Sequence, residues 1–150
     1  KMIISHPFFG DETAIFSYGA DGKLHYHERG GMEPGRFYHK YDNKGNVTEV
    51  VEKAREQNGS WYEVGRAMLD YDMQNRMTKV SYYEMGHLMG YSLFRYDHSG
   101  HLATHRMYEN DVQLMEVNYN YEKGLRTSGR LTVHDGGTQI KEFYEYIFWK

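Results

Sequence analysis

The sequence predicts an all-β protein: tandem β-hairpin repeats forming one curled antiparallel meander sheet of about eleven strands, partly closed or folded over itself. Two observations predict this class, a regular spacing of tyrosines and a turn sequence after most of them. The regularly spaced tyrosines are Tyr71, Tyr96, Tyr121 and Tyr146, at intervals of 25 residues, and similar units start at Tyr18 and Tyr41. Such a period is typical of a repeated supersecondary unit. We therefore interpret residues 1–150 as a single repeat domain.

The turn sequence explains how each hairpin closes. Tyr41 precedes Asp42-Asn43-Lys44-Gly45, and Tyr96 precedes Asp97-His98-Ser99-Gly100. Asp at the first turn position can accept hydrogen bonds from backbone N–H groups two residues on. Gly supplies the positive φ that closes a three- to four-residue loop built on a type I turn. Where Gly is replaced, the substitute is Asn75, which also tolerates positive φ.

A second turn is expected about halfway through each unit. The expected turn pairs are Gly30-Gly31, Asn58-Gly59, Met85-Gly86, Asn110-Asp111 and Gly136-Gly137. Two strands of about nine residues and two short turns account for the repeat length. The intervals are rich in Tyr, Val, Thr, Phe and Met, as strands prefer.

One segment also fits a helix. Val47, Val50, Val51 and Ala54 follow helical spacing, and Asn46 with Glu49 forms a capping-box pattern. The neighbouring units place a strand there, and the interval from Tyr41 to Tyr71 is five residues longer than the 25-residue intervals that follow it. We predict a strand followed by a longer loop over 55–60, with a helix over 46–58 as the alternative.

The composition indicates a thin sheet with wetted faces. There are 15 Tyr, 7 Phe and 2 Trp but only 39% hydrophobic residues, so tyrosine must supply much of the apolar area. A tyrosine can bury its ring while its hydroxyl reaches water. The net charge of −3, with acidic and basic residues interleaved, lacks the basic patch of a nucleic-acid binder. No apolar stretch is long enough for a transmembrane segment, and no Cys is present.

Two sequence patterns resemble a known repeat. Tyr41-Asp42-x-x-Gly45-x-Val47 and Tyr96-Asp97-x-x-Gly100-x-Leu102 resemble the YD (Rhs-type) repeat. The run from Gly59 to Glu63, leading to Asp70-Tyr71-Asp72, is similar to a small exported family of unknown function from Bacteroidales. The likeness covers residues 14–149. The likeness implies a twisted sheet of hairpins that is exported to the periplasm, cell surface or exterior. In large Rhs proteins such repeats build a shell around a toxin, but six units are too few to close such a shell. The start Lys1-Met2-Ile3-Ile4 fits a mature product whose leader has been removed.

Histidines and carboxylates are the residues that could bind a metal ion or carry catalysis. His25 and His27 are expected on one face of a strand, about 6.5 Å apart, with His39 on a neighbouring strand. Without an acidic or Cys partner at fixed spacing, solvent-facing imidazoles are the better interpretation, so no metal site and no cofactor is predicted. Asp42, Asp72 and Asp97 recur at one turn position, which explains them without catalysis, and no catalytic residue is assigned.

The aromatic residues indicate binding. Tyrosines at a fixed repeat position are expected to stack as a ladder along the sheet, and exposed aromatics suit sugar rings or a protein partner. The predicted binding residues, chosen for aromatic density, are Trp61, Tyr62, Tyr82, Tyr83 and Tyr91. We therefore predict a non-catalytic exported interaction module that binds a glycan or a protein through an aromatic sheet face or edge. The alternatives are a small β-barrel that binds an apolar ligand and, after it, a hydrolase.

Overall fold

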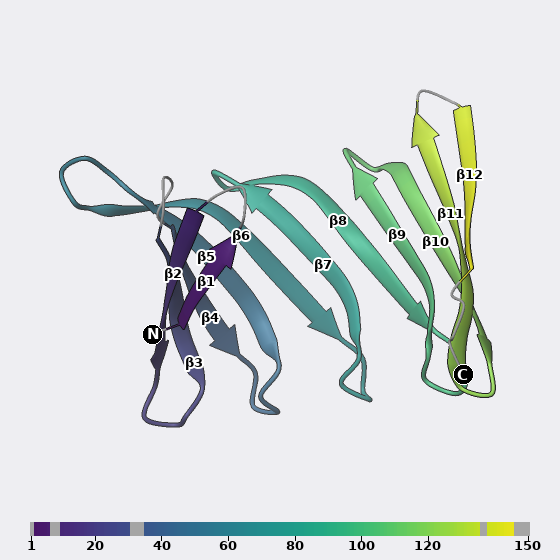
Figure 1. Cartoon of the computed structure of the whole chain (residues 1–150), viewed down its shortest axis with the longest axis horizontal. Helices are drawn as coiled ribbons and strands as arrows, with labels where there is room; N and C mark the ends of the chain where they lie inside the picture. Colours follow the sequence, from purple (N-terminus) through teal and green to yellow (C-terminus); the bar gives the residue numbers. More distant parts are fainter. Residues whose placement is uncertain (1, 7–9, 31–34, 136–137, 146–150) are drawn as a thin grey trace. The chain divides into compact units, whose positions relative to one another are not determined.

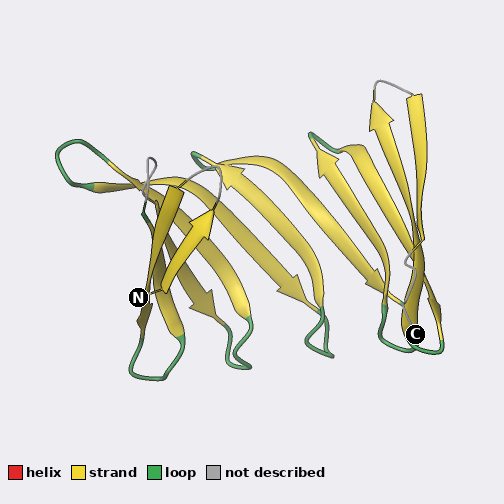
Figure 2. Cartoon of the chain, viewed as in Figure 1, coloured by secondary structure: helices red, strands yellow, loops and turns green. Residues whose placement is uncertain are grey.

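Strands and short turns make up the described chain (Figure 2). The computed structural model describes the backbone of residues 2–6, 10–30, 35–135 and 138–145, and the side chains of residues 14–30 and 35–134. These residues contain no helix, and so none that could cross a membrane. The strands are β1 (Met2–His6), β2 (Gly10–Tyr18), β3 (Leu24–Arg29), β4 (Gly35–Tyr41), β5 (Val47–Arg55), β6 (Trp61–Tyr71), β7 (Met77–Glu84), β8 (His87–Tyr96), β9 (Leu102–Glu109), β10 (Val112–Glu122), β11 (Leu125–Asp135) and β12 (Thr138–Glu145).

The strand order is sequential from β1 to β12, which confirms the predicted antiparallel meander of hairpins (Figure 1). Twelve strands are described, against about eleven predicted, because β1 precedes the first tyrosine unit. The chain divides into two compact units. The first comprises residues 1–69 and 82–87, and the second comprises 70–81 and 88–150.

The Asp-containing turns form as the sequence predicts. In the Asp97 turn, Oδ1 of the carboxylate accepts hydrogen bonds from the backbone N–H groups of Ser99 and His101 at 2.8 and 2.9 Å. Gly100 closes the loop at φ 86°, and Asn75 takes the same place in the Asp72 turn at φ 61°. The backbone bond from Gly100 N–H to the Asp97 carbonyl, at 3.1 Å, is the one expected of a type I turn. The aspartates therefore hold the turns.

Three other hairpins close with a different kind of turn. Met85-Gly86 and Asn110-Asp111 have positive φ at both positions, which defines a two-residue type I′ turn. Lys123-Gly124 closes its hairpin in the same way. The predicted turns at Met85, Asn110 and Asn58-Gly59 are confirmed. The expected Gly30-Gly31 and Gly136-Gly137 turns and the unit starting at Tyr146 fall wholly or partly outside the described residues.

The segment that also fitted a helix is strand β5. It pairs with β4 on one side, where Tyr38 faces Val51, and with β6 on the other, where Val51 faces Arg66. The loop between β5 and β6 covers residues 56–60, as predicted. Pairing on both sides satisfies the backbone polar groups of β5, and this outweighs the local helical spacing.

A register shift precedes the repeat tyrosine in four hairpins. It lies between Ser17 and Tyr18, Lys40 and Tyr41, Arg95 and Tyr96, and Asn120 and Tyr121. Each shift places an additional residue on the partner strand, which is a β-bulge. A bulge interrupts the simple alternation of side chains between the two faces.

In the described part of the chain, Tyr41, Tyr96 and Tyr121 do not stack on other repeat tyrosines, contrary to the expected ladder. Instead, the side chain that follows the positive-φ turn residue lies over the next tyrosine ring. Arg76 lies over Tyr96 at 4.7 Å, and His101 stacks on Tyr121 with ring centroids 4.6 Å apart. Lys23 lies over Tyr41 at 5.2 Å. Each of these tyrosine rings is therefore covered by a basic or imidazole side chain. In two of the turns an aspartate holds that side chain: Asp72 pairs with Arg76, and Asp97 pairs with His101.

Few apolar side chains are buried. Val51 and Val80 are the described hydrophobic side chains that reach core-like burial, each 7% exposed. No described side chain is fully buried. Much of the fold therefore depends on cross-strand pairs and turn hydrogen bonds rather than on a second layer, consistent with the wetted sheet expected from the composition.

Candidate functional site

One face of the first unit carries a network of charged and aromatic side chains. The register places Tyr26 opposite Tyr38, Glu28 opposite Arg36, and Lys40 opposite Glu49. We call the sheet face that carries these six side chains the polar face. Its residues used below are Tyr26, Glu28, Arg36, Tyr38, Lys40, Glu49, Val51, Lys53, Trp61, Glu63, Arg66 and Met68.

Arg36 lies at the centre of the polar face. Its guanidinium is 4.3 Å from the Trp61 ring and 5.2 Å from the Tyr26 ring, within the range of cation–π contacts. It also bonds Glu28 at 2.8 Å, and this hydrogen bond raises the pKa of the guanidinium. Lys53 lies over Tyr38 at 5.2 Å. These contacts fix the orientation of each ring.

Arg66 joins two carboxylates next to this cluster. Its guanidinium contacts Glu49 at 2.7 Å and Glu63 at 2.9 Å, and Glu49 also pairs with Lys40 at 2.6 Å. Glu49 is 8% exposed and paired, whereas Glu63 is open to solvent. The hydrogen bond from Arg66 lowers the pKa of the Glu63 carboxyl, so this carboxylate is ionised at neutral pH.

A groove of about 360 Å³ lies beside this ion-pair network. Its lining residues are Glu63, Arg66, Met68, Tyr83 and Gly86, all within the first unit. Met68 is 46% exposed. The groove thus combines an aromatic ring, a thioether and a paired carboxylate and guanidinium, so it can contact an apolar surface and hydrogen-bond a polar rim at the same time.

The five predicted binding residues do not form one patch. Trp61 and Tyr62 are successive residues of β6, and Tyr82 and Tyr83 are successive residues of β7, so each pair divides between the two faces. Trp61 lies against Arg36, and Tyr83 lines the groove. Tyr62 and Tyr82 are each 46% exposed.

Tyr91, the fifth predicted residue, belongs to the second unit. It faces Tyr108 across strands β8 and β9, and the rings stack at 4.7 Å. Its hydroxyl donates to Asp111 at 3.3 Å, and Lys79 lies 4.9 Å from its ring. Burial, with the nearby Asp111 charge, raises the pKa of Tyr91. These contacts, from β7, β9 and the turn after β9, hold the ring in place within the second unit.

The histidines are arranged differently from the expectation. The register shift at Ser17/Tyr18 makes His25 the additional bulge residue, and its ring lies 5.9 Å from Tyr26 and from Tyr38. The His27 ring stacks instead on Phe37 at 4.6 Å. The ring contacts of His25 and His27 are therefore different, although the sequence predicts both histidines on one face. His39 does lie next to His27, from strand β4, as expected.

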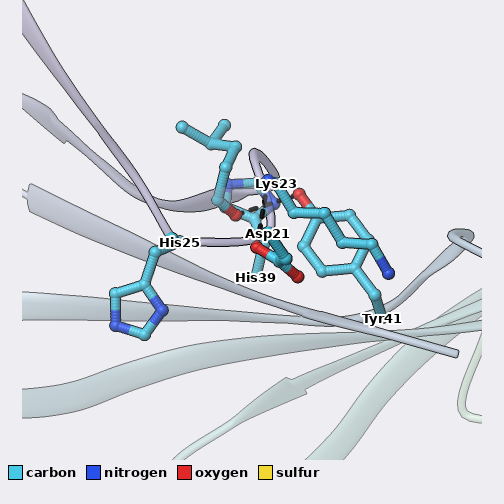
Figure 3. Close-up of a pocket in the computed structure, with 7 residues that line it drawn as sticks. Asp21, Lys23, His25, His39 and Tyr41 are labelled. Carbon is cyan, nitrogen blue, oxygen red and sulfur yellow. Dashed lines mark hydrogen bonds between the residues drawn. The ribbon is translucent and has the colours of Figure 1, made fainter.

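A smaller cavity of about 80 Å³ lies at the turn end of these strands. Its charged and polar lining residues are Asp21, Lys23, His25, His39 and Tyr41 (Figure 3). In Figure 3 the His25 ring points away from Asp21, Lys23 and Tyr41. Asp21 accepts a hydrogen bond from the backbone N–H of Lys23 at 3.1 Å. Among the described residues, no group of three potential metal ligands comes together.

The groove residues Glu63, Arg66 and Met68 were missed from the sequence. Val64 is an additional residue in β6 opposite the Glu52/Lys53 step of β5, and this bulge brings Glu63 and Arg66 to the same face. Strict alternation would have placed them on opposite faces. The only signal for this ion pair in the sequence was an acidic residue followed three positions later by a basic one. The bulge itself cannot be recognised from the sequence.

Comparisons with known proteins give no family. No protein-family model matches the chain, and no curated protein matches it. Among solved structures, the chain is similar to a protein of unknown function from Bacteroides fragilis, with 13% identity and a TM-score of 0.35, covering 90% of this chain and 93% of that one. It is also similar to a porin-like protein from Bacteroides uniformis, with 9% identity and a TM-score of 0.33, covering 89% and 88% of the two chains.

Proposed function

We propose that the chain is a non-catalytic, exported interaction module that binds a glycan in the groove beside Tyr83. The observation that carries this proposal is the joint lining of one groove by Tyr83, Met68 and the Glu63–Arg66 ion pair. Its volume of about 360 Å³ falls at the lower end of the range of ligand pockets, about 300 to 1,000 Å³.

The chemistry of the groove favours a sugar. A pyranose ring has an apolar C–H side, which packs on an aromatic ring, and a rim of hydroxyls. The Glu63 carboxylate accepts hydrogen bonds and the Arg66 guanidinium donates them, so together they match the two roles of a hydroxyl. Because Arg66 is held by Glu49 and Glu63, little side-chain entropy is lost on binding.

Export is the second part of the proposal. It rests on the resemblance of the Tyr41 and Tyr96 units to YD repeats and of the segment around Trp61 to an exported Bacteroidales family. A module outside the cytoplasm would meet envelope or environmental glycans.

A glycan array probed with the full chain tests the proposal, followed by titration of the best glycan against variants. We expect Tyr83→Ala to weaken binding at least tenfold, because it removes the ring against which the sugar packs. The matched control is Tyr82→Ala, the neighbouring tyrosine on the other face, which should leave affinity within about twofold. An array with no binder would overturn the proposal, even if an envelope protein were captured in parallel. Equal losses in both variants would also overturn it.

A further inference from the structure

Two histidines from adjacent strands meet in the first unit, outside the groove. Nδ1 of His27, on β3, lies 3.1 Å from Nε2 of His39, on β4. A hydrogen bond between two imidazoles needs a single proton, because one nitrogen donates and the other accepts. In the neutral tautomers that carry their protons on His27 Nε2 and His39 Nδ1, the two facing nitrogens both direct lone pairs into the same small space.

The separation is close to that of two ligands on one metal ion. Zinc–nitrogen bonds of about 2.0 to 2.1 Å at a tetrahedral angle place the two nitrogens about 3.3 to 3.4 Å apart. The His27 and His39 nitrogens therefore need to separate by only about 0.2 to 0.3 Å to share an ion. Both rings must also turn so that their lone pairs converge on the ion instead of facing each other.

The rings are held in place by their neighbours. His27 stacks on Phe37 with an interplanar angle of 8°, and Phe37 is its direct cross-strand partner. Phe16 lies on β2, opposite His27, with its ring centroid 6.0 Å away. This stack limits rotation of the His27 imidazole. Pre-organised ligand rings reduce the entropy lost when an ion binds.

The cavity next to His39 leaves room for further ligands. His39 lines this cavity together with Asp21 and Tyr41, and the cavity offers space for water and for an oxygen ligand (Figure 3). Nearby Arg29 opposes an added positive charge, which limits the affinity.

We propose that His27 and His39 form a two-histidine site for a divalent late transition-metal ion, with water completing its coordination. Imidazole ligands favour Cu²⁺, Ni²⁺ and Zn²⁺ over Mg²⁺ and Ca²⁺, and Cu²⁺ binds most tightly in the general order of affinities. With only two protein ligands, we expect a lower affinity than that of a site with three or four protein ligands. The site lies between β3 and β4 and does not use the groove at Tyr83.

Calorimetric titration of the full chain with Cu²⁺, Ni²⁺ and Zn²⁺ tests the site. We expect one ion per chain and no binding of Mg²⁺ or Ca²⁺. His27→Gln and His39→Gln should each weaken binding at least tenfold, because glutamine keeps a polar side chain but supplies no imidazole nitrogen. The matched controls are His25→Gln and His105→Gln, which should leave affinity within about twofold. Equal losses in the controls would overturn the proposal, as would the absence of saturable binding.

A measurement on the unmodified chain does not depend on the folding of the variants. Substoichiometric paramagnetic Ni²⁺ or Cu²⁺ should first broaden the imidazole NMR signals of His27 and His39, while those of the exposed His98 stay sharp. First broadening at any other histidine would place the ion elsewhere and overturn the proposal.

Discussion

The hydroxyl of Tyr96, the last residue of β8, donates a hydrogen bond to the main-chain carbonyl of Met77, the first residue of β7, at 2.9 Å. Tyr121 makes the same contact with Leu102 at 3.1 Å, and Tyr41 makes it with Leu24 at 2.9 Å. In these contacts a repeat tyrosine ties the end of its strand to the start of the preceding strand. The 25-residue period therefore reflects tyrosines that repeat both the position of the ring and the hydrogen bond of the hydroxyl.

Removal of this hydroxyl should lower stability. We expect Tyr96→Phe to reduce the free energy of unfolding by about 1 kcal/mol, the usual contribution of a hydrogen bond within a protein. Tyr96→Leu should reduce it further, because the ring contact with Arg76 is lost as well. Urea unfolding measures both, with Tyr62→Phe, at a half-exposed position, as the control. If Tyr96→Phe were as stable as the control, the hydrogen bond would not contribute.

The Asn75 turn gives a second prediction. Asn75 has φ 61°, a conformation that costs most L-residues about 1 to 2 kcal/mol. Asn75→Gly should therefore be close to neutral, while Asn75→Ala should lose about 1 kcal/mol, as measured by urea unfolding. The control is Gln74→Ala, an exposed residue of the same turn. Similar stabilities for the two Asn75 variants would contradict the role assigned to positive φ.

Acid should weaken the Asp turns. Backbone N–H groups that bond its carboxylate hold the pKa of Asp97 below its usual value. The folded state therefore binds the proton less readily than the unfolded chain, whose Asp titrates near pH 3.9. The stabilisation is complete above that pH and is lost as the pH falls through the lower folded pKa. Asp97→Asn should be less stable than the unmodified chain at pH 7, and the difference should shrink towards about pH 2. A difference that stays constant with pH would contradict this account.

Turn chemistry was the predictable part of the fold. An Asp followed three residues later by Gly or Asn has few favourable conformations, so Asp42, Asp72 and Asp97 identified their turns from sequence alone. Strand β5 could also be predicted, but only from its neighbours in the repeat. Its own valine spacing indicated a helix, and pairing with β4 and β6 decided the outcome.

The sites were less predictable because β-bulges change which side chains meet. The additional residue at His25 separates its ring contacts from those of His27, and the one at Val64 brings Glu63 and Arg66 to one face. A bulge next to a turn leaves little trace in residue type. Aromatic density pointed to Tyr83, but the groove depends on charged neighbours that a strict two-residue period assigns to opposite faces.

Replacement of His105 should make stability less dependent on pH. His105, on β9, faces Phe94 across the strand pair, and the rings stack at 4.6 Å with an interplanar angle of 9°. Burial lowers the pKa of His105, so protonation favours the unfolded chain, whose histidines titrate near pH 6.5. The stability that a neutral His105 provides is therefore complete above about pH 6.5 and declines as the pH falls.

His105→Phe keeps an aromatic ring against Phe94 and removes the titrating group. Its free energy of unfolding should fall less between about pH 7 and pH 5 than that of the unmodified chain. Some decline should persist, because burial also lowers the pKa of His27 and His39. The control is His98→Asn, in an exposed turn, which should keep the original slope. Urea unfolding across this range measures the slopes, and a His105→Phe slope equal to that of the control would show that His105 is not the titrating group.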